Sequence, residues 1–332
     1  MNYKELFSKT PPTKLFFTAA IPGSIGMLAS ALYQTIDGML VGRILSGNAF
    51  AALNLAMPLV IINFSLADLI GVGSAVPISV RLGEKKEGEA NNIFTSACLM
   101  IVAAGFILGL AIFLSAPALI GLMGAEGELA ELAVQYLRVY CLCSPFTTIV
   151  FAMDNYLKIC GRVRSSMALN IVMSVLSAAL EFLFLFVFRW GIWAAALGTC
   201  TSMFVCALAA LYPFFRKKMQ LRFVRPKFDR TMMKTIVTCG SPNFLNNVAG
   251  RITSIIMNVI LLQVGGATAV SVYGILMFAD GFVQPLLYGM CDSLQPAVGY
   301  NWGAGALKRV KDIEKRCFTA GAILSIASAV VI

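Results

Sequence analysis

Residues 15–41 read LFFTAAIPGSIGMLASALYQTIDGMLV and contain one charged side chain, that of Asp37. A helix needs about 20 apolar residues to cross the hydrocarbon core of a bilayer. Lys14 and the small residues 29–31 imitate a cleaved signal peptide, but the apolar run continues to Val41. The stretch therefore predicts a retained first membrane span.

Similar apolar stretches recur along the whole chain. Hydrophobic residues make up 59%, charged residues 13%, and the mean hydropathy is +0.82. A soluble domain would carry about 25% charged residues, so the fold class expected is an all-α polytopic membrane protein. A ninth span begins near Cys317 and is cut by the chain end at Ile332. The complete spans predicted are 15–42, 50–79, 92–115, 132–157, 165–187, 191–214, 236–263 and 268–299.

The basic residues are sorted by loop, which predicts the orientation. All but four of the 26 lysines and arginines lie in the N-terminal segment or in alternate connections. Arg43 and Arg189 fall in the other connections, and Arg138 and Arg251 lie inside spans. The positive-inside rule then predicts a multi-pass protein of the cell (cytoplasmic) membrane with a cytoplasmic N-terminus. The net charge of +10 reflects this topology and does not indicate a nucleic-acid partner.

The longest polar connection divides the chain. Eight basic residues lie between Arg216 and Lys234. Shifting the sequence by 220 residues brings the apolar runs into register and aligns Pro22 with Pro242. We therefore expect two repeated bundles, although an ordinary cytoplasmic loop is the alternative. The expected domains are a first six-helix bundle at 1–215, a basic cytoplasmic linker at 216–235, and an incomplete second bundle at 236–332, with two full spans and part of a third.

Two acids lie at similar depth inside predicted spans. Asp37 and Glu181 both fall roughly 8 Å below the outer boundary, at 1.5 Å per residue. Ionisable groups in the hydrocarbon region are costly, and they mark functional sites by default. A pair of carboxylates in one pocket could exchange a proton for a cationic substrate, or bind sodium through its oxygens. The alternative is that each acid is merely a hydrogen-bonded structural group.

Other polar side chains reach the same layer. Thr199 lies at a similar depth in the sixth span, and Tyr136 is somewhat shallower in the fourth. Ser177 precedes Glu181 by four residues, as Tyr33 precedes Asp37, so each pair shares one helix face. The sequence thus predicts a layer of acids, hydroxyls and phenols in the outer half of the first bundle.

The remaining intramembrane charges have no partner that the sequence alone can place. Asp68, Asp280 and Asp292 fall in the middle of spans, and structural and functional roles stay open for all three. Asp154 lies near an inner helix end, where an interfacial position is expected. Arg251 in the seventh span could pair with Asp280 across the second bundle.

Short motifs occur in a fixed order along the chain. They are TID at 35–37, VGR at 41–43, RLG at 81–83, GIWAAALGT at 191–199, QP at 295–296 and GYNWGA at 299–304. Together with the topology they resemble the multidrug and toxic compound extrusion (MATE) family over essentially the whole chain. The resemblance implies two V-shaped six-helix bundles, of which this chain would hold the first and part of the second, truncated after about eight and a half helices.

The resemblance also implies a cation-coupling site in the first bundle. Asp37 and Thr199 match its acid and threonine directly. Glu181 stands where the family usually has aspartate, and Ser177 where it usually has asparagine, which leaves the choice between proton and sodium open. Asn155 matches another polar position of the family. The possible cavity-lining residues are Tyr33, Tyr136, Asn155, Arg251 and Asp280.

The function expected from these features is secondary active multidrug efflux. Cationic or amphipathic compounds would leave in exchange for protons or sodium, with no cofactor, through a monomer in the lipid bilayer. Alternatives are a lipid-linked oligosaccharide flippase of the same superfamily, or a non-transporting fragment. An enzyme is not expected, because the chain has no histidine and Gly71, Val72 and Gly73 are followed by Ser74 rather than by the aspartate of an intramembrane protease.

Overall fold

The structure, a computed structural model, describes residues 3–45 and 47–331, without the side chains at 251, 255, 258, 259, 262, 266–271, 275 and 331. These ranges consist mainly of helices and contain no strand. The elements are η1 (Glu5–Lys9), α1 (Pro12–Ile44), α2 (Gly47–Gly83), α3 (Glu87–Leu122), α4 (Gly127–Ile159), α5 (Val163–Phe182), η2 (Leu183–Val187), α6 (Ile192–Phe215), α7 (Arg230–Gly303) and α8 (Leu307–Val331).

The helices have the length and surface of membrane spans. Seven described segments are long and apolar enough to cross a bilayer, namely α1 to α6, with α5 extended through η2, and Val272–Gly303 of α7. The predicted span 236–263 is helical but includes undescribed side chains and is not among the seven. Large apolar side chains such as Leu114 and Leu142 are 70% and 71% exposed, as a lipid-facing surface requires. The prediction of an all-α polytopic membrane protein is confirmed.

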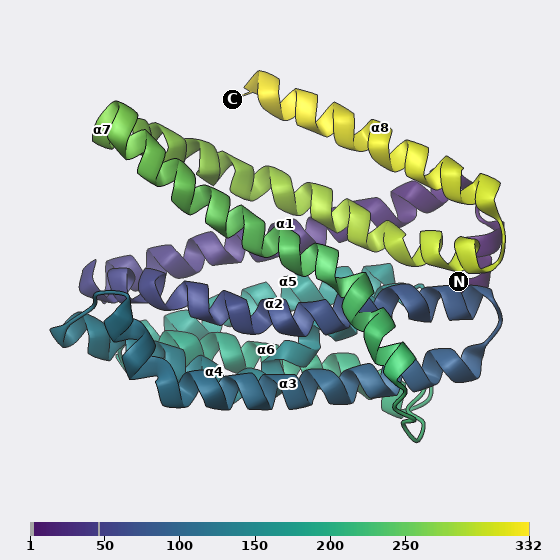
Figure 1. Ribbon diagram of the computed structural model, residues 1–332, viewed down its shortest axis with the longest axis horizontal. Coiled ribbons are helices and arrows are strands. Elements are labelled where there is room, and N and C mark those ends of the chain that lie inside the picture. The colour runs from purple at the N-terminus through teal and green to yellow at the C-terminus, as the bar shows by residue number, and fades with distance from the viewer. Residues whose placement is uncertain (1–2, 46, 332) are drawn as a thin grey trace.

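Helix α7 folds back on itself. A straight helix at 1.5 Å per residue would separate Asn246 from Tyr288 by about 63 Å. Instead, the Asn246 side-chain amide donates to the Tyr288 hydroxyl at 2.5 Å. Figure 1 shows the two arms of α7 running toward one end of the molecule and back. The two predicted spans 236–263 and 268–299 therefore form one antiparallel pair of arms.

The first six helices pack around one another, and α7 and α8 lie to one side (Figure 1). Helix α2 contacts α3 and α4, α1 contacts α5, and α6 contacts α4 and α5. Helix α7 packs on α1 and α2, and α8 packs mainly on α7. The polar connection 216–229 separates α6 from α7. The division into two repeated bundles remains a prediction.

One end of the molecule gathers the segments that are rich in lysine and arginine, and we call it the basic end (Figure 1, right). Lys4 pairs with Glu87 at the start of α3, with 3.1 Å between Nζ and Oε1. Gly161, in the turn between α4 and α5, adopts φ +74°, and a Cβ there would lie 3.0 Å from the Cα of Tyr3. The Arg309 guanidinium donates to the Phe7 carbonyl at 2.8 Å. That the basic end faces the cytoplasm remains a prediction.

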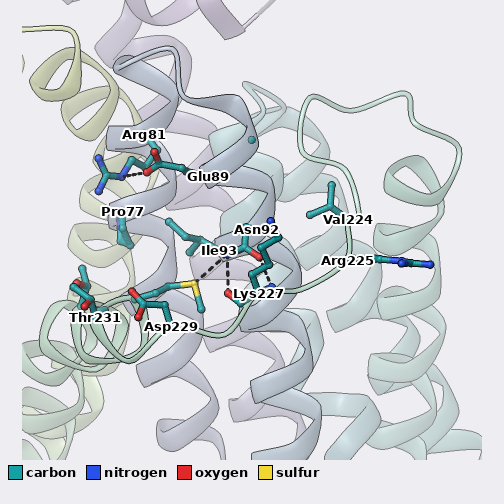
Figure 2. A pocket seen from close by; sticks show the side chains of 13 residues that line it. Pro77, Arg81, Glu89, Asn92, Ile93, Val224, Arg225, Lys227, Asp229 and Thr231 are labelled. Atoms are coloured by element: carbon teal, nitrogen blue, oxygen red, sulfur yellow. Dashed lines mark hydrogen bonds and ion pairs between the residues drawn. The ribbon is translucent and has the colours of Figure 1, made fainter.

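The connection 216–229 is bound along α3 rather than hanging free. Asn92 accepts a hydrogen bond from the Lys227 backbone N–H at 2.7 Å and donates one to the Lys227 carbonyl at 3.0 Å (Figure 2). One residue earlier, Asn91 accepts from the Arg222 backbone N–H at 2.8 Å. These bonds satisfy backbone groups of an extended segment that has no helix or sheet of its own. The connection is thus part of the surface of the first bundle.

A cavity of about 540 Å³ lies where this connection passes α2 and α3 (Figure 2). Pro77 and Thr231 line it, together with Arg81, whose Nε lies 3.0 Å from the Glu89 carboxylate. None of the intramembrane acids predicted from the sequence lines this cavity. It is therefore separate from the predicted coupling site.

Candidate functional site

The structure brings Asp37 of α1 and Glu181 of α5 together. Both side chains are buried, with 5% and 0% exposure, and their carboxyl groups are neighbours that interact directly. Asp37 Oδ1 and Glu181 Oε1 have no hydrogen-bond donor among the described residues. Two ionised carboxylates would only repel one another there, because both are acceptors. One proton between them makes the contact a hydrogen bond, whereas a bound cation would be coordinated by oxygens of both carboxylates.

Tyr33 joins this pair to α6. Its hydroxyl lies 2.6 Å from the Thr199 hydroxyl and 3.4 Å from Glu181 Oε2. A phenol carries a single proton, so Tyr33 donates either to Thr199 or to Glu181. When Thr199 donates to Tyr33, the Tyr33 proton is free for Glu181. The side chains of α1, α5 and α6 thus form a short chain of hydroxyls that ends on the acid pair.

Local helix geometry places Glu181 in this pocket. Helix α5 ends at Phe182, one residue after the acid, and continues as the π-helical turn η2. Such turns change the direction of side chains and are frequent at functional sites. On the facing helix, a Cβ at Gly198 would lie 3.0 Å from the Glu181 backbone nitrogen and 3.2 Å from its Cα. Because Gly198 has no side chain, α6 packs closely against α5 beside Glu181. The next residue of α6, Thr199, contacts Tyr33 of α1.

This close approach predicts the effect of enlarging Gly198. Gly198→Leu is expected to lower the free energy of unfolding by about 1–3 kcal/mol, because the added side chain overpacks the contact with Glu181. Gly198→Ala is expected to cost less, since one methyl group requires a shift of only a few tenths of an ångström. Unfolding by SDS, followed by intrinsic fluorescence, measures both variants. A leucine variant as stable as the unmodified protein would contradict the packing described here.

Ser177 shares a helix face with Glu181 but hydrogen-bonds to a serine of α6 instead. Its hydroxyl lies 2.5 Å from that of Ser202 on α6, and Ser202 donates to the Met173 carbonyl at 2.9 Å. Both serines are buried. Ser177 thus shares a helix face with Glu181, as the sequence predicts, but its recorded hydrogen bond goes to Ser202. The sequence analysis missed Ser202, and no sequence signal distinguishes it from other serines in spans.

Two phenols close the other side of the acid pair. Tyr136 and Tyr140 are buried, with their ring centroids 5.2 Å apart. Both tyrosines lie near Asp37, and Tyr140 also lies next to Thr199. The sequence analysis selected Tyr136 and missed Tyr140. The spacing of four residues, which puts both on one helix face, would have found it.

Two of the predicted cavity-lining residues, Asn155 and Asp280, make no contact with this site in the described part of the chain, and a third, Arg251, is not described there. The Asn155 amide makes its recorded hydrogen bond to the Phe151 carbonyl of its own helix, at 3.4 Å. Asp280 is half-buried on α7 and has no hydrogen bond or ion pair with any side chain that the structure describes. Arg251 belongs to α7, but its side chain lies outside the described residues. A pairing of Arg251 with Asp280 thus stays untested.

Comparison with known proteins identifies the family. The model of the MatE family matches residues 22–183 and 242–332 of the chain. The chain belongs to the MatE family. The first matched MatE segment holds Asp37 and Glu181, and the second begins one residue before Asn243. The membership confirms the family resemblance predicted from the motifs.

Individual members of the MatE family cover nearly all of the chain. The multidrug export protein MepA of Staphylococcus aureus is 26% identical over 313 residues, which are 93% of this chain and 68% of MepA. Among solved structures, a multidrug resistance MATE transporter in an outward-facing conformation superposes with a TM-score of 0.94, at 22% identity, over 100% of this chain and 73% of the other. These likenesses place the chain in one fold with MATE transporters.

A further structural neighbour shows that the fold does not fix the function. A MOP superfamily transporter from Pyrococcus furiosus superposes with a TM-score of 0.91, at 23% identity, over 98% of this chain and 72% of the other. It is described as having a binding pocket of reversed polarity that suggests a different function. Function in this fold therefore depends on the polarity of the pocket and does not follow from the fold alone.

Proposed function

We propose that this MatE-family chain acts in secondary active efflux of cationic or amphipathic compounds, as MepA is named for multidrug export. The observation that supports the proposal most strongly is the buried pair of Asp37 and Glu181, each of which has one carboxylate oxygen without a donor in the described part of the chain. Such a pair binds a proton or a cation reversibly, because either one relieves the repulsion between two carboxylates. We expect a monomer in the cell membrane, with a cytoplasmic N-terminus and no enzymatic step.

The neighbours of the pair favour a proton as the coupling ion. A sodium ion would need several oxygen ligands, yet Ser177 is engaged by Ser202. A single proton between Asp37 and Glu181 requires no further ligand. Exchange then follows from competition: a proton bound to the pair from outside favours release of the compound, and binding of the compound from inside favours loss of the proton. Each ligand shifts the equilibrium only by its differential affinity for the two states.

A gradient experiment separates the two ions. Proteoliposomes that contain the chain are expected to move tetraphenylphosphonium when a pH gradient is imposed in sodium-free buffer. An equal sodium gradient without a pH gradient is expected to drive no movement above that of empty liposomes. Movement that follows the sodium gradient alone would contradict proton coupling, and absence of movement under both gradients would contradict efflux of this compound.

The flippase alternative needs a cationic cavity among the spans for a phosphorylated lipid, and Arg138 is the one arginine inside a predicted span whose side chain is described. Arg138 is exposed, and its guanidinium lies over the Phe113 ring at 5.3 Å. It therefore lies against an aromatic surface rather than in the pocket of Asp37. The acidic character of that pocket favours a cationic substrate.

A further inference from the structure

A second group of charged side chains lies within the helices, away from Asp37 and Glu181. It comprises Asp68 on α2, Asp154 and Lys158 on α4, and Asn243 and Asp292 on α7, and we call it the inner polar cluster. Because α7 reaches this cluster with both of its arms, the cluster connects the first six helices to the part of the chain that follows the linker.

Asp154 and Lys158 form the fixed part of the inner polar cluster. Lys158 Nζ lies 2.7 Å from Asp154 Oδ2, and both side chains are almost fully buried. The second carboxylate oxygen of Asp154 accepts hydrogen bonds from Ser166 at 2.5 Å and from Asn170 at 3.0 Å. Both charges lie on one helix, four residues apart, so this pair persists whatever α7 does. The sequence analysis placed Lys158 in a cytoplasmic connection and Asp154 at the interface, whereas the structure buries both.

The contacts to α7 form the other part of the cluster. The Asn243 amide donates to Asp68 Oδ2 at 3.1 Å, which links the first arm of α7 to α2. Asp292, on the second arm, interacts electrostatically with Lys158, as does Asp68. Asp68 and Asp292 repel one another, and the Lys158 ammonium offsets that repulsion. A single buried lysine thus attracts two acids that lie on opposite sides of the contact between α2 and α7.

The backbones of α2 and α7 touch beside this cluster. A Cβ at Gly240 would lie 1.9 Å from the Leu69 carbonyl oxygen, and one at Gly73 would lie 2.1 Å from the Ile236 carbonyl oxygen. Leu69 directly follows Asp68, and Gly240 precedes Asn243 by three residues. Figure 1 shows α7 crossing α2 here and diverging from it toward the other end of the molecule. The contact is therefore confined to the half of the molecule that carries the basic end.

We propose that the inner polar cluster is a latch that holds α7 against α2 at the basic end. The Asn243–Asp68 hydrogen bond and the attraction of Lys158 for Asp292 keep the contact closed. When α7 moves away, Asp68 and Asp292 regain water, and their hydration offsets much of the lost contact energy. The contact can thus open and close, unlike the Asp154–Lys158 pair, which stays intact in both states. The latch supplies the movement that the proposed function requires, but it does not depend on the coupling ion.

The latch is tested by measuring distances across the basic end. Spin labels are attached to p-acetylphenylalanine introduced at Lys85 and Trp302, both exposed, so the native cysteines remain. Asn243→Ala and Asp292→Asn are each expected to raise the ratio of long to short distances at least about fivefold, because a hydrogen bond or attraction to a charged group is lost. Asp280→Asn is the matched control on α7 and is expected to leave the ratio unchanged.

A further variant excludes a general loss of folding as the cause. Asn243→Lys places an ammonium beside Asp68 and is expected to shift the ratio toward the short distance, opposite to Asn243→Ala. The latch is overturned if Asn243→Ala and Asp292→Asn give the distances of the unmodified protein, or if Asn243→Lys opens the contact as the alanine does. These distances are recorded without transport. If the distances change as expected but the protein exports nothing, the proposed function is refuted and the latch is not.

Discussion

Asp37→Asn is expected to reduce pH-gradient-driven export of tetraphenylphosphonium to the level of empty liposomes. An asparagine amide neither releases nor shares a proton, so the contact with Glu181 becomes a permanent hydrogen bond instead of a reversible one. Glu181→Gln is expected to have the same effect for the same reason. Because the side chains keep their size, both variants are expected to fold and to elute from size exclusion as the unmodified protein does. Initial rates of uptake into proteoliposomes measure the loss.

The matched control for this experiment is Asp280→Asn, an acid inside α7 that is half-buried and outside the pair. It is expected to keep most of the export rate. If Asp37→Asn exports like the unmodified protein, the pair has no coupling role, whatever its burial. If Asp280→Asn loses export to the same extent, the loss reflects a general need for acids in the helices and not a specific role of Asp37.

Of the proposed substitutions, Lys158→Met is expected to lower the free energy of unfolding the most. The ammonium is paired at 2.7 Å with Asp154, and both side chains are less than a tenth exposed. Removing one partner of a buried ion pair leaves an uncompensated charge, which typically costs about 3–5 kcal/mol. Unfolding by SDS at neutral pH measures the loss. We expect the hydrogen bonds from Ser166 and Asn170 to keep Asp154 in place without replacing the lost charge.

A double variant tests this explanation. In Lys158→Met combined with Asp154→Leu, neither charge of this ion pair is left, and apolar residues of similar volume often replace such pairs at little cost. The double variant is therefore expected to recover most of the stability that Lys158→Met loses. A double variant that is less stable than either single variant would show that the two side chains stabilise the helices separately rather than as an ion pair.

Depth along the helices was sufficient to predict that Asp37, Glu181 and Thr199 lie close together, while their function stays a prediction. Asp37, Glu181 and Thr199 were expected in one layer from their distance to span ends, and the structure brings them together through Tyr33. That inference works because a membrane helix has a fixed rise and a defined boundary. Ser177 shows the limit of the inference from depth. Its neighbour Ser202 lies on another helix, and rotation of α6 about its axis cannot be read from depth.

The inner polar cluster was not predicted when charged residues were assigned to spans or connections from the sequence. Lys158 was assigned to a cytoplasmic connection because it follows a predicted span, yet α4 continues to Ile159 and buries it. The spacing of four residues after Asp154 would have indicated a pair on one helix face. Asp68 and Asn243 are 175 residues apart, and only the packing of α7 on α2 joins them. A contact of this kind needs the structure.

The bend of α7 has a similar explanation. Two spans were predicted on either side of residues 264–267, and the structure keeps this region helical while the two arms run antiparallel (Figure 1). The span pattern gave the direction of each arm. It did not show that the second arm would bring Asp292 beside Lys158, because that depends on how α7 is rotated against α4.

The proposed function requires that Asp37 and Glu181 share a proton that competes with the transported compound. This competition is measured as the pH change of a weakly buffered detergent solution of the protein when tetraphenylphosphonium is added. We predict release of protons by the unmodified protein and by Asp280→Asn, and none by Asp37→Asn or Glu181→Gln. Binding of the compound without proton release, or equal release from all four proteins, would contradict the claim.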